Sequence, residues 1–203
     1  YNSQHLEKIA SATAIRQQIK QLQENNQALI NQELKTALPP ATINILEEEF
    51  RTGSGPIFPK DLTPHILTVL RRQSRQELQH YEDVRGGLEN RIKKAALNSS
   101  SWSELITAIK TKRFTQTRLQ RILAQALINL KEQDLAAFDQ AGGPLYFRIL
   151  GFNQQGQKLL HIIKEKGELP LISRVANHFK TNYQPQNLRQ KMLNYDLQAN
   201  NIY

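Results

Sequence analysis

Apolar residues recur every three or four positions along most of the chain, which is the period of one face of an α-helix. The clearest run spans 119–130 and comprises Leu119, Ile122, Leu123, Ala126, Leu127 and Leu130. The same period predicts helices over 11–30, 42–50, 61–72, 77–81, 88–97, 102–112, 134–138 and 187–200. The predicted fold class is therefore mainly α, a helical bundle.

The pattern changes after Gly142-Gly143-Pro144. Two apolar runs, Leu145 to Phe152 and Leu169 to Ser173, are typical of strands, and a helical run that contains Leu159 and Ile163 lies between them. A strand, a helix and a second strand this close together predict a small C-terminal βαβ unit with parallel strands. Because two strands make a weak sheet, we expect this unit to lean on the helices or on sheet residues outside the chain.

Residues 110–121 join two predicted helices and carry five cations and no acid: Lys110, Lys112, Arg113, Arg118 and Arg121. We call this segment the basic hairpin. Because the helix that follows it has a buried face, its charges are held in fixed places, which a flexible basic tail does not achieve. The alternative interpretation is a solvated start to a core helix.

The charge of the whole chain favours an anionic partner. The net charge is +9 and the isoelectric point is about 9.8. Nine cations and two acids, Glu89 and Glu104, lie between Arg85 and Arg121, so this stretch has a net charge of +7. Its only aromatic residues are Trp102 and Phe114, which favours contact with phosphates over base stacking.

A second candidate anion site lies at the predicted helix start near residue 11. Ser11 is a natural N-cap, and the hydroxyl of Thr13 and the guanidinium of Arg16 follow within the first turns. Free helix amides, hydroxyls and a cation together attract an anion. The alternative is a plain capped helix.

Several classes of site are excluded by the sequence. The absence of Cys excludes disulfides, thiolate zinc sites and thiol catalysis, and fits a reducing cytoplasm. The five histidines show no metal-ligand spacing, so no metal site is expected. The segment from Gly53 to Pro56 lacks the Lys-Ser or Lys-Thr of a phosphate-binding loop. From the residues alone, the chain is a basic, mainly helical domain that contacts RNA or DNA.

Three segments carry a resemblance to a known family: IASATAIR at 9–16, GLENRI at 87–92 and KTKRFTQTRLQR at 110–121. Together they resemble the bacterial tRNA(Met) cytidine acetate ligases. RILGFN at 148–153, LPLIS at 169–173 and DLQANNIY at 196–203 extend the resemblance in the same order. The segment at 110–121 is its most specific part, whereas the one at 9–16 recurs across nucleotidyltransferases.

The resemblance implies an enzyme that uses ATP, with Mg²⁺, to activate acetate as acetyl-adenylate and then acetylates the wobble cytidine of elongator methionine tRNA. The family's His-x-Gly-His motif, which belongs to its nucleotidyltransferase-like α/β domain, does not occur in this sequence. The resemblance therefore implies a C-terminal half that contains no catalytic residue and is inactive alone. It also implies a cytoplasmic protein with tRNA, and no membrane, as its partner.

The resemblance assigns parts of the chain to roles. Residues 1–38 would end the nucleotidyltransferase-like domain, 39–141 would form a helical tRNA-binding domain, and 142–203 would form the βαβ unit and a terminal helix. Ser11, Thr13 and Arg16 would contact ATP phosphates. The residues expected to hold tRNA are Arg91, Lys93, Lys94, Lys110, Lys112, Arg113, Thr117, Arg118 and Arg121.

Two other functions stay open at this point. A non-catalytic helical module that binds nucleic acid or protein would need no upstream His-x-Gly-His motif. An adenylyltransferase that makes a dinucleotide cofactor would share the motif at 11–16, but it would give no reason for the basic hairpin.

Overall fold

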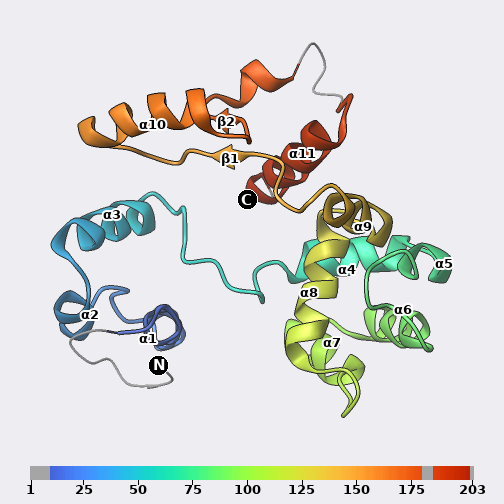
Figure 1. Cartoon of the computed structure of the whole chain (residues 1–203). Coiled ribbons are helices and arrows are strands. Elements are labelled where there is room, and N and C mark those ends of the chain that lie inside the picture. Colours follow the sequence, from blue (N-terminus) through green and yellow to red (C-terminus); the bar gives the residue numbers. More distant parts are fainter. Residues whose placement is uncertain (1–9, 180–184, 202–203) are drawn as a thin grey trace. The chain divides into compact units, whose positions relative to one another are not determined.

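The computed structural model describes residues 10–179 and 185–201, and these are mainly helical, as predicted (Figure 1). Two compact units divide the chain, with the boundary between Leu62 and Thr63. The predicted boundaries after residues 38 and 141 differ from this one, and the three-part division stays a prediction. Within the described residues, no helix combines the length and apolar character needed to cross a membrane.

The first unit contains α1 (Ala12–Glu24), α2 (Gln32–Ala37) and α3 (Pro40–Arg51). Its core forms around Ile19, Leu22 and Leu34. The predicted N-cap is confirmed, because the Ser11 hydroxyl accepts a hydrogen bond from the amide of Ala14 at 3.2 Å.

Two boundaries in this unit were predicted wrongly. Helix α1 ends at Glu24 rather than near residue 30, because Asn26 adopts a left-handed conformation (φ 53°) that turns the chain. The predicted start of the next helix, at residue 42, lies inside α3. The helix starts at Pro40, whose fixed φ suits a first helical position and whose missing amide donor is not needed there.

The second unit begins with six helices: α4 (Thr63–Arg72), α5 (Arg75–Leu78), α6 (Leu88–Asn98), α7 (Trp102–Ile109), α8 (Gln116–Leu127) and α9 (Glu132–Gln140). Helix α4 packs against α6 and α8, and α6 packs against α7. Helix α5 starts earlier than predicted because Ser74 and Glu77 form a capping box. The predicted apolar face of α8 is buried at Leu119, Ile122, Leu123 and Ala126.

The C-terminal part of this unit contains β1 (Phe147–Arg148), α10 (Gln154–Lys166), β2 (Leu171–Ile172), a 3₁₀ turn (Val175–His178) and α11 (Leu188–Asn200). The two strands pair in parallel, as predicted, with Phe147 opposite Leu171. They are much shorter than the apolar runs that contain them. The amides of Phe147 and Ile149 donate to Pro170 and Ile172 at 3.0 and 2.9 Å.

Helix α11 is tied back to α9 by a buried carboxylate. Asp134 is 5% exposed and accepts hydrogen bonds at 2.5 Å from both the Lys191 ammonium and the Tyr195 hydroxyl. A second tie runs from α11 to β1, where Arg148 donates to Asp196 at 2.9 Å. Burial is the main reason that the pKa of Tyr195 is raised, and the hydrogen bond to Asp134 raises it further.

Candidate nucleic-acid interface

The basic hairpin forms as a tight turn between α7 and α8, which are neighbours in the fold (Figure 1). The turn is closed by two bonds: the Phe114 amide donates to the Thr111 hydroxyl at 3.1 Å, and the Thr111 amide donates to the Phe114 carbonyl at 3.3 Å. Thr115 caps α8, and Thr117 lies exposed in the first turn of that helix. Lys110, Lys112 and Arg113 are also exposed.

Phe114 organises the arginines of the hairpin. Phe114 is 7% exposed, and the guanidinium carbons of Arg113 and Arg118 lie 5.5 and 5.3 Å from its ring centroid. Gly86 leaves room for Arg113, because a Cβ atom at Gly86 would lie 3.2 Å from the nearer guanidinium nitrogen. The only aromatic residue of this segment therefore supports cations and offers no exposed ring on which a base could stack.

Two acids from outside the basic hairpin neutralise part of its charge. Arg118 donates to the main-chain oxygen of Asp83 at 2.8 Å and lies 3.2 Å from its carboxylate. Arg121 pairs with the other carboxylate oxygen of Asp83 and lies 4.0 Å from Glu82. These acids precede the +7 stretch in the sequence by two and three positions, so the charge count missed them.

The cations of α6 separate into two groups. Arg91 donates to the carbonyl of Ile109 at 2.9 Å, which places it beside the base of the basic hairpin. Lys94, one turn further along α6, is exposed. Lys93 is directed elsewhere, since its ammonium donates to the carbonyls of Leu70, Arg71 and Gln73 at 3.1, 2.6 and 2.5 Å.

The structure therefore gives Lys93 a role within the fold. Carbonyls at a helix C-terminus lack intrahelical donors, and an ammonium group near them also complements the helix dipole. The exposed cations that remain near the base and turn of the hairpin are Arg91, Lys94, Lys110, Lys112 and Arg113. We call these five residues the open basic patch.

The candidate phosphate site lies at the start of α1, in the other unit. The first intrahelical bond runs from the Ile15 amide to the Ser11 carbonyl at 3.0 Å, so the amides of Ala12 and Thr13 precede the helical ladder. The Ser11 hydroxyl accepts the capping bond, which leaves its proton available to a ligand. Thr13 and Arg16 are exposed on the surface of this unit.

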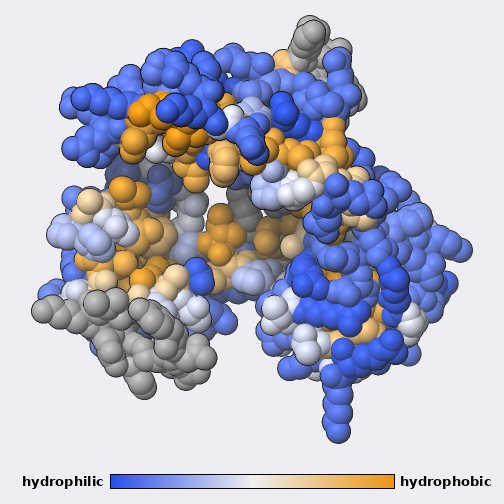
Figure 2. Space-filling view, viewed as in Figure 1, coloured by the Kyte–Doolittle hydropathy of each residue, from blue (hydrophilic) through white to orange (hydrophobic). Residues whose placement is uncertain are grey.

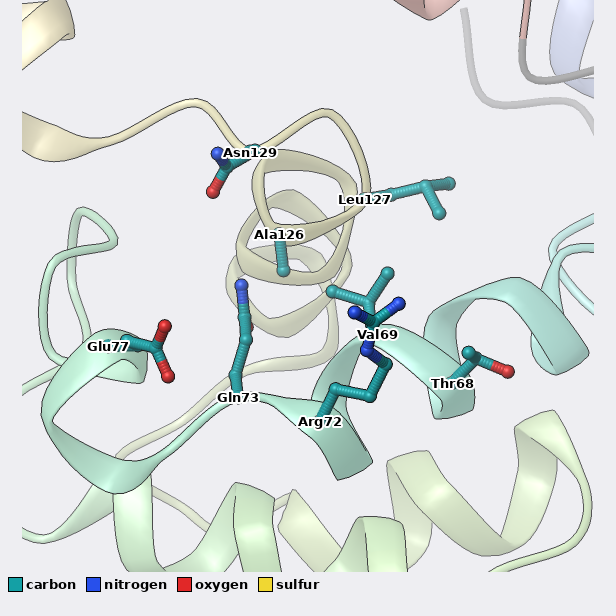
Figure 3. A pocket seen from close by; sticks show the side chains of 8 residues that line it. All are labelled: Thr68, Val69, Arg72, Gln73, Glu77, Ala126, Leu127 and Asn129. Carbon is teal, nitrogen blue, oxygen red and sulfur yellow. The ribbon is translucent and has the colours of Figure 1, made fainter.

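A cavity of about 390 Å³ lies between α4, α5 and the end of α8 and was not foreseen from the sequence (Figure 3). It is lined by Thr68, Val69, Arg72, Gln73, Glu77, Ala126, Leu127 and Asn129. The Gln73 side-chain amide donates to the Tyr81 hydroxyl, which in turn donates to Asn129 at 3.2 Å. The residues that line the cavity are scattered over about 60 positions of the sequence, so no local motif indicates it.

Comparison with known proteins shows the family. A model of the HIGH nucleotidyltransferases matches residues 1–203. The chain belongs to the HIGH nucleotidyltransferase family. This membership agrees with the resemblance of 9–16 to nucleotidyltransferases, although residues 1–9 lie outside the described part of the structure.

Curated relatives of this HIGH nucleotidyltransferase chain are named tRNA(Met) cytidine acetate ligase. The protein of Halothermothrix orenii is 42% identical over 205 residues, which cover 100% of this chain and 47% of the relative. The protein of Acetivibrio thermocellus is 36% identical over 182 residues, which cover 89% of this chain and 43% of the relative. The chain thus spans about half the length of the curated relatives it matches.

Solved structures of Thermotoga maritima TmcAL share the fold of this HIGH nucleotidyltransferase chain. The apo form aligns with a TM-score of 0.82 at 22% identity and covers 98% of this chain and 46% of that protein. The form bound with alpha-thio ATP aligns with a TM-score of 0.81 at 24% identity over 95% of this chain and 46% of that protein.

Proposed function

We propose that this chain is the C-terminal, tRNA-binding half of an ATP-dependent ligase that acetylates the wobble cytidine of elongator tRNA(Met). The observation that carries the proposal is the 42% identity, along the whole chain, to a protein named tRNA(Met) cytidine acetate ligase. The likeness in fold to a nucleotide-bound TmcAL is consistent with it.

The open basic patch is the part of the chain that we assign to tRNA. Its five cations lie on α6 and on the hairpin turn, and the Arg91 bond to Ile109 holds the two segments together. Cations in fixed positions contact the phosphates of an A-form helix, whose narrow major groove hides its bases from side chains. The patch would therefore hold the body of a tRNA by its shape.

The start of α1 is the part that we assign to ATP. Helix amides, the Ser11 and Thr13 hydroxyls and the Arg16 guanidinium together neutralise phosphate charge, which is what adenylation of a carboxylate requires. In this proposal ATP, with Mg²⁺, and acetate react at a site completed by the other half of the protein. The chain alone would bind tRNA without catalysing the reaction.

The test is an acetylation assay on the full-length protein with ATP, radiolabelled acetate and methionine tRNA. ATP-dependent incorporation of label into the tRNA supports the proposal. A full-length protein that binds tRNA but incorporates no acetate would instead be a non-catalytic RNA-binding module. A full-length protein that transfers the adenylyl group of ATP to a mononucleotide would be an adenylyltransferase that makes a dinucleotide cofactor.

The open basic patch is tested separately with Lys112→Ala, Arg113→Ala in one protein, because both side chains are exposed. We expect the double variant to bind tRNA more weakly and with a shallower dependence on salt, because fewer phosphates are neutralised. Unchanged binding at equal salt would remove the basic hairpin from the tRNA site.

A further inference from the structure

The βαβ unit exposes a large apolar surface. Nine large apolar side chains are exposed among the described residues, and six of them lie between positions 147 and 163: Phe147, Leu150, Phe152, Leu159, Ile162 and Ile163. Three of them, Leu159, Ile162 and Ile163, lie on one side of α10, and we call these three residues the apolar face. Figure 2 shows the orange, hydrophobic atoms gathered around α10 and the strands below it.

Helix α10 lacks the packing that its sequence predicts. Leu159, Ile162 and Ile163 share one side of the helix, yet they are 59, 48 and 42% exposed. No residue of α10 is buried. On its other side, a groove of about 710 Å³ separates α10 from the strands and is lined partly by polar groups, including His161 and Lys164.

The sheet is equally incomplete. Among residues 10–179 and 185–201 it has two strands of two residues each, which pair with each other. Parallel sheets normally contain more strands and are covered on both faces, because their connections place helices there. Apolar area on the order of several hundred Å² together with open strand edges is typical of a surface that another segment covers.

We propose that the apolar face is the surface on which the remaining half of the full-length protein docks. The inference rests on the proposal that this chain is one half of a longer ligase. The chain covers 47 and 43% of two curated relatives, so on that proposal the full-length ligase carries a second segment of similar length. A segment on the same polypeptide has a high effective concentration and covers such a surface ahead of a separate partner.

The chemistry of the surface excludes tRNA as its occupant. Phosphates and sugars dominate the surface of an RNA, and they would leave Leu159, Ile162 and Ile163 uncovered. The docked segment must instead present aliphatic or aromatic side chains, and a strand at its border would extend the sheet. The βαβ unit would then hold the two halves of the ligase together, while the open basic patch holds the tRNA.

The experiment introduces the photo-crosslinker p-benzoylphenylalanine into the full-length protein at Leu159, and at Leu97 as a matched control. Leu97 is a leucine with almost the same exposure, 61%, and lies on α6 away from the βαβ unit. After irradiation, mass spectrometry identifies the crosslinked peptides. We expect crosslinks from position 159 to peptides outside the residues of this chain, at least several times more abundant than those from position 97.

Two results overturn the inference. Crosslinked dimers would show that a second copy covers the apolar face, and equal yields at both positions would show that nothing does. Neither readout involves tRNA, ATP or acetate, so a failure here is distinguishable from a failure of the acetylation assay. As a second measurement, Leu159→Ser, Ile163→Ser should speed protease cleavage of the full-length protein several-fold, whereas Leu97→Ser should not.

Discussion

Asp83 holds two arginines of the basic hairpin, and replacing it should strengthen RNA binding. Asp83→Asn removes the negative charge shared by Arg118 and Arg121 but keeps the main-chain oxygen to which Arg118 donates at 2.8 Å. The conformation of Arg118 is thereby preserved while its charge becomes available to phosphate. Asp139→Asn, which removes an exposed acid in the last turn of α9, is the matched control.

The magnitude follows from the number of cations released. Each additional arginine that neutralises a phosphate steepens the plot of log K against log salt by about 0.9, so two give a change of between about 1 and 2. Removing a like charge near a phosphate contributes about 1 kcal/mol at low salt, or roughly fivefold in affinity. Since Arg121 is 57% exposed, it is the arginine that turns more easily to an RNA.

The assay is fluorescence-anisotropy titration of labelled tRNA with wild type, Asp83→Asn and Asp139→Asn between 50 and 200 mM salt, a range chosen because such slopes are large there. Tighter binding and a steeper slope in Asp83→Asn alone are expected. Weaker binding in Asp83→Asn would refute the reasoning, because it would mean that Asp83 positions the arginines for RNA instead of competing with it.

Three further outcomes are expected. Arg16→Ala in the full-length protein should raise the ATP concentration needed for half-maximal acetylation and leave tRNA binding unchanged; the reverse pattern would remove ATP from the α1 site. Lys93→Met should lower the free energy of unfolding by about 1–3 kcal/mol in urea denaturation and leave the salt slope of RNA binding unchanged. Lys94→Met should leave the free energy of unfolding unchanged and make the salt slope of RNA binding shallower. Burial and the nearby Asp196 carboxylate raise the pKa of Tyr146 to about 12. The stability that the protonated Tyr146 hydroxyl contributes is therefore complete below pH 10 and is lost as the pH rises from 10 to 12. Tyr146→Phe should make the fall in the free energy of unfolding over that pH range less steep.

Local patterns predicted most helices well because their causes are local. The apolar period of α8 and the cap at Ser11 are both visible within a few residues of sequence, and both are present. Helix boundaries were less predictable. Asn26 ends α1 by adopting a left-handed conformation; Asn tolerates that conformation, but its presence alone does not decide that a helix stops there.

The candidate site was predictable only in part because its charges are balanced across the fold. The sequence shows that Arg118 and Arg121 are close together. Asp83 is separated from them by α6 and α7 in the sequence, and it reaches them only when the chain has folded. Lys93 is equally informative. The next residue, Lys94, is exposed, and only the position of the α4 C-terminus explains why the Lys93 ammonium turns inward.

The bonds from Asp134 to Lys191 and Tyr195 join α9 to α11 and so close a long loop of chain between the two helices. They join positions 57 and 61 residues apart, so both ends of the loop lie at one point of α9. Closing so long a loop costs only slightly more entropy than closing a short one. A change in the length of this segment should therefore cost little closure entropy as long as the bonds of Asp134 to α11 are kept.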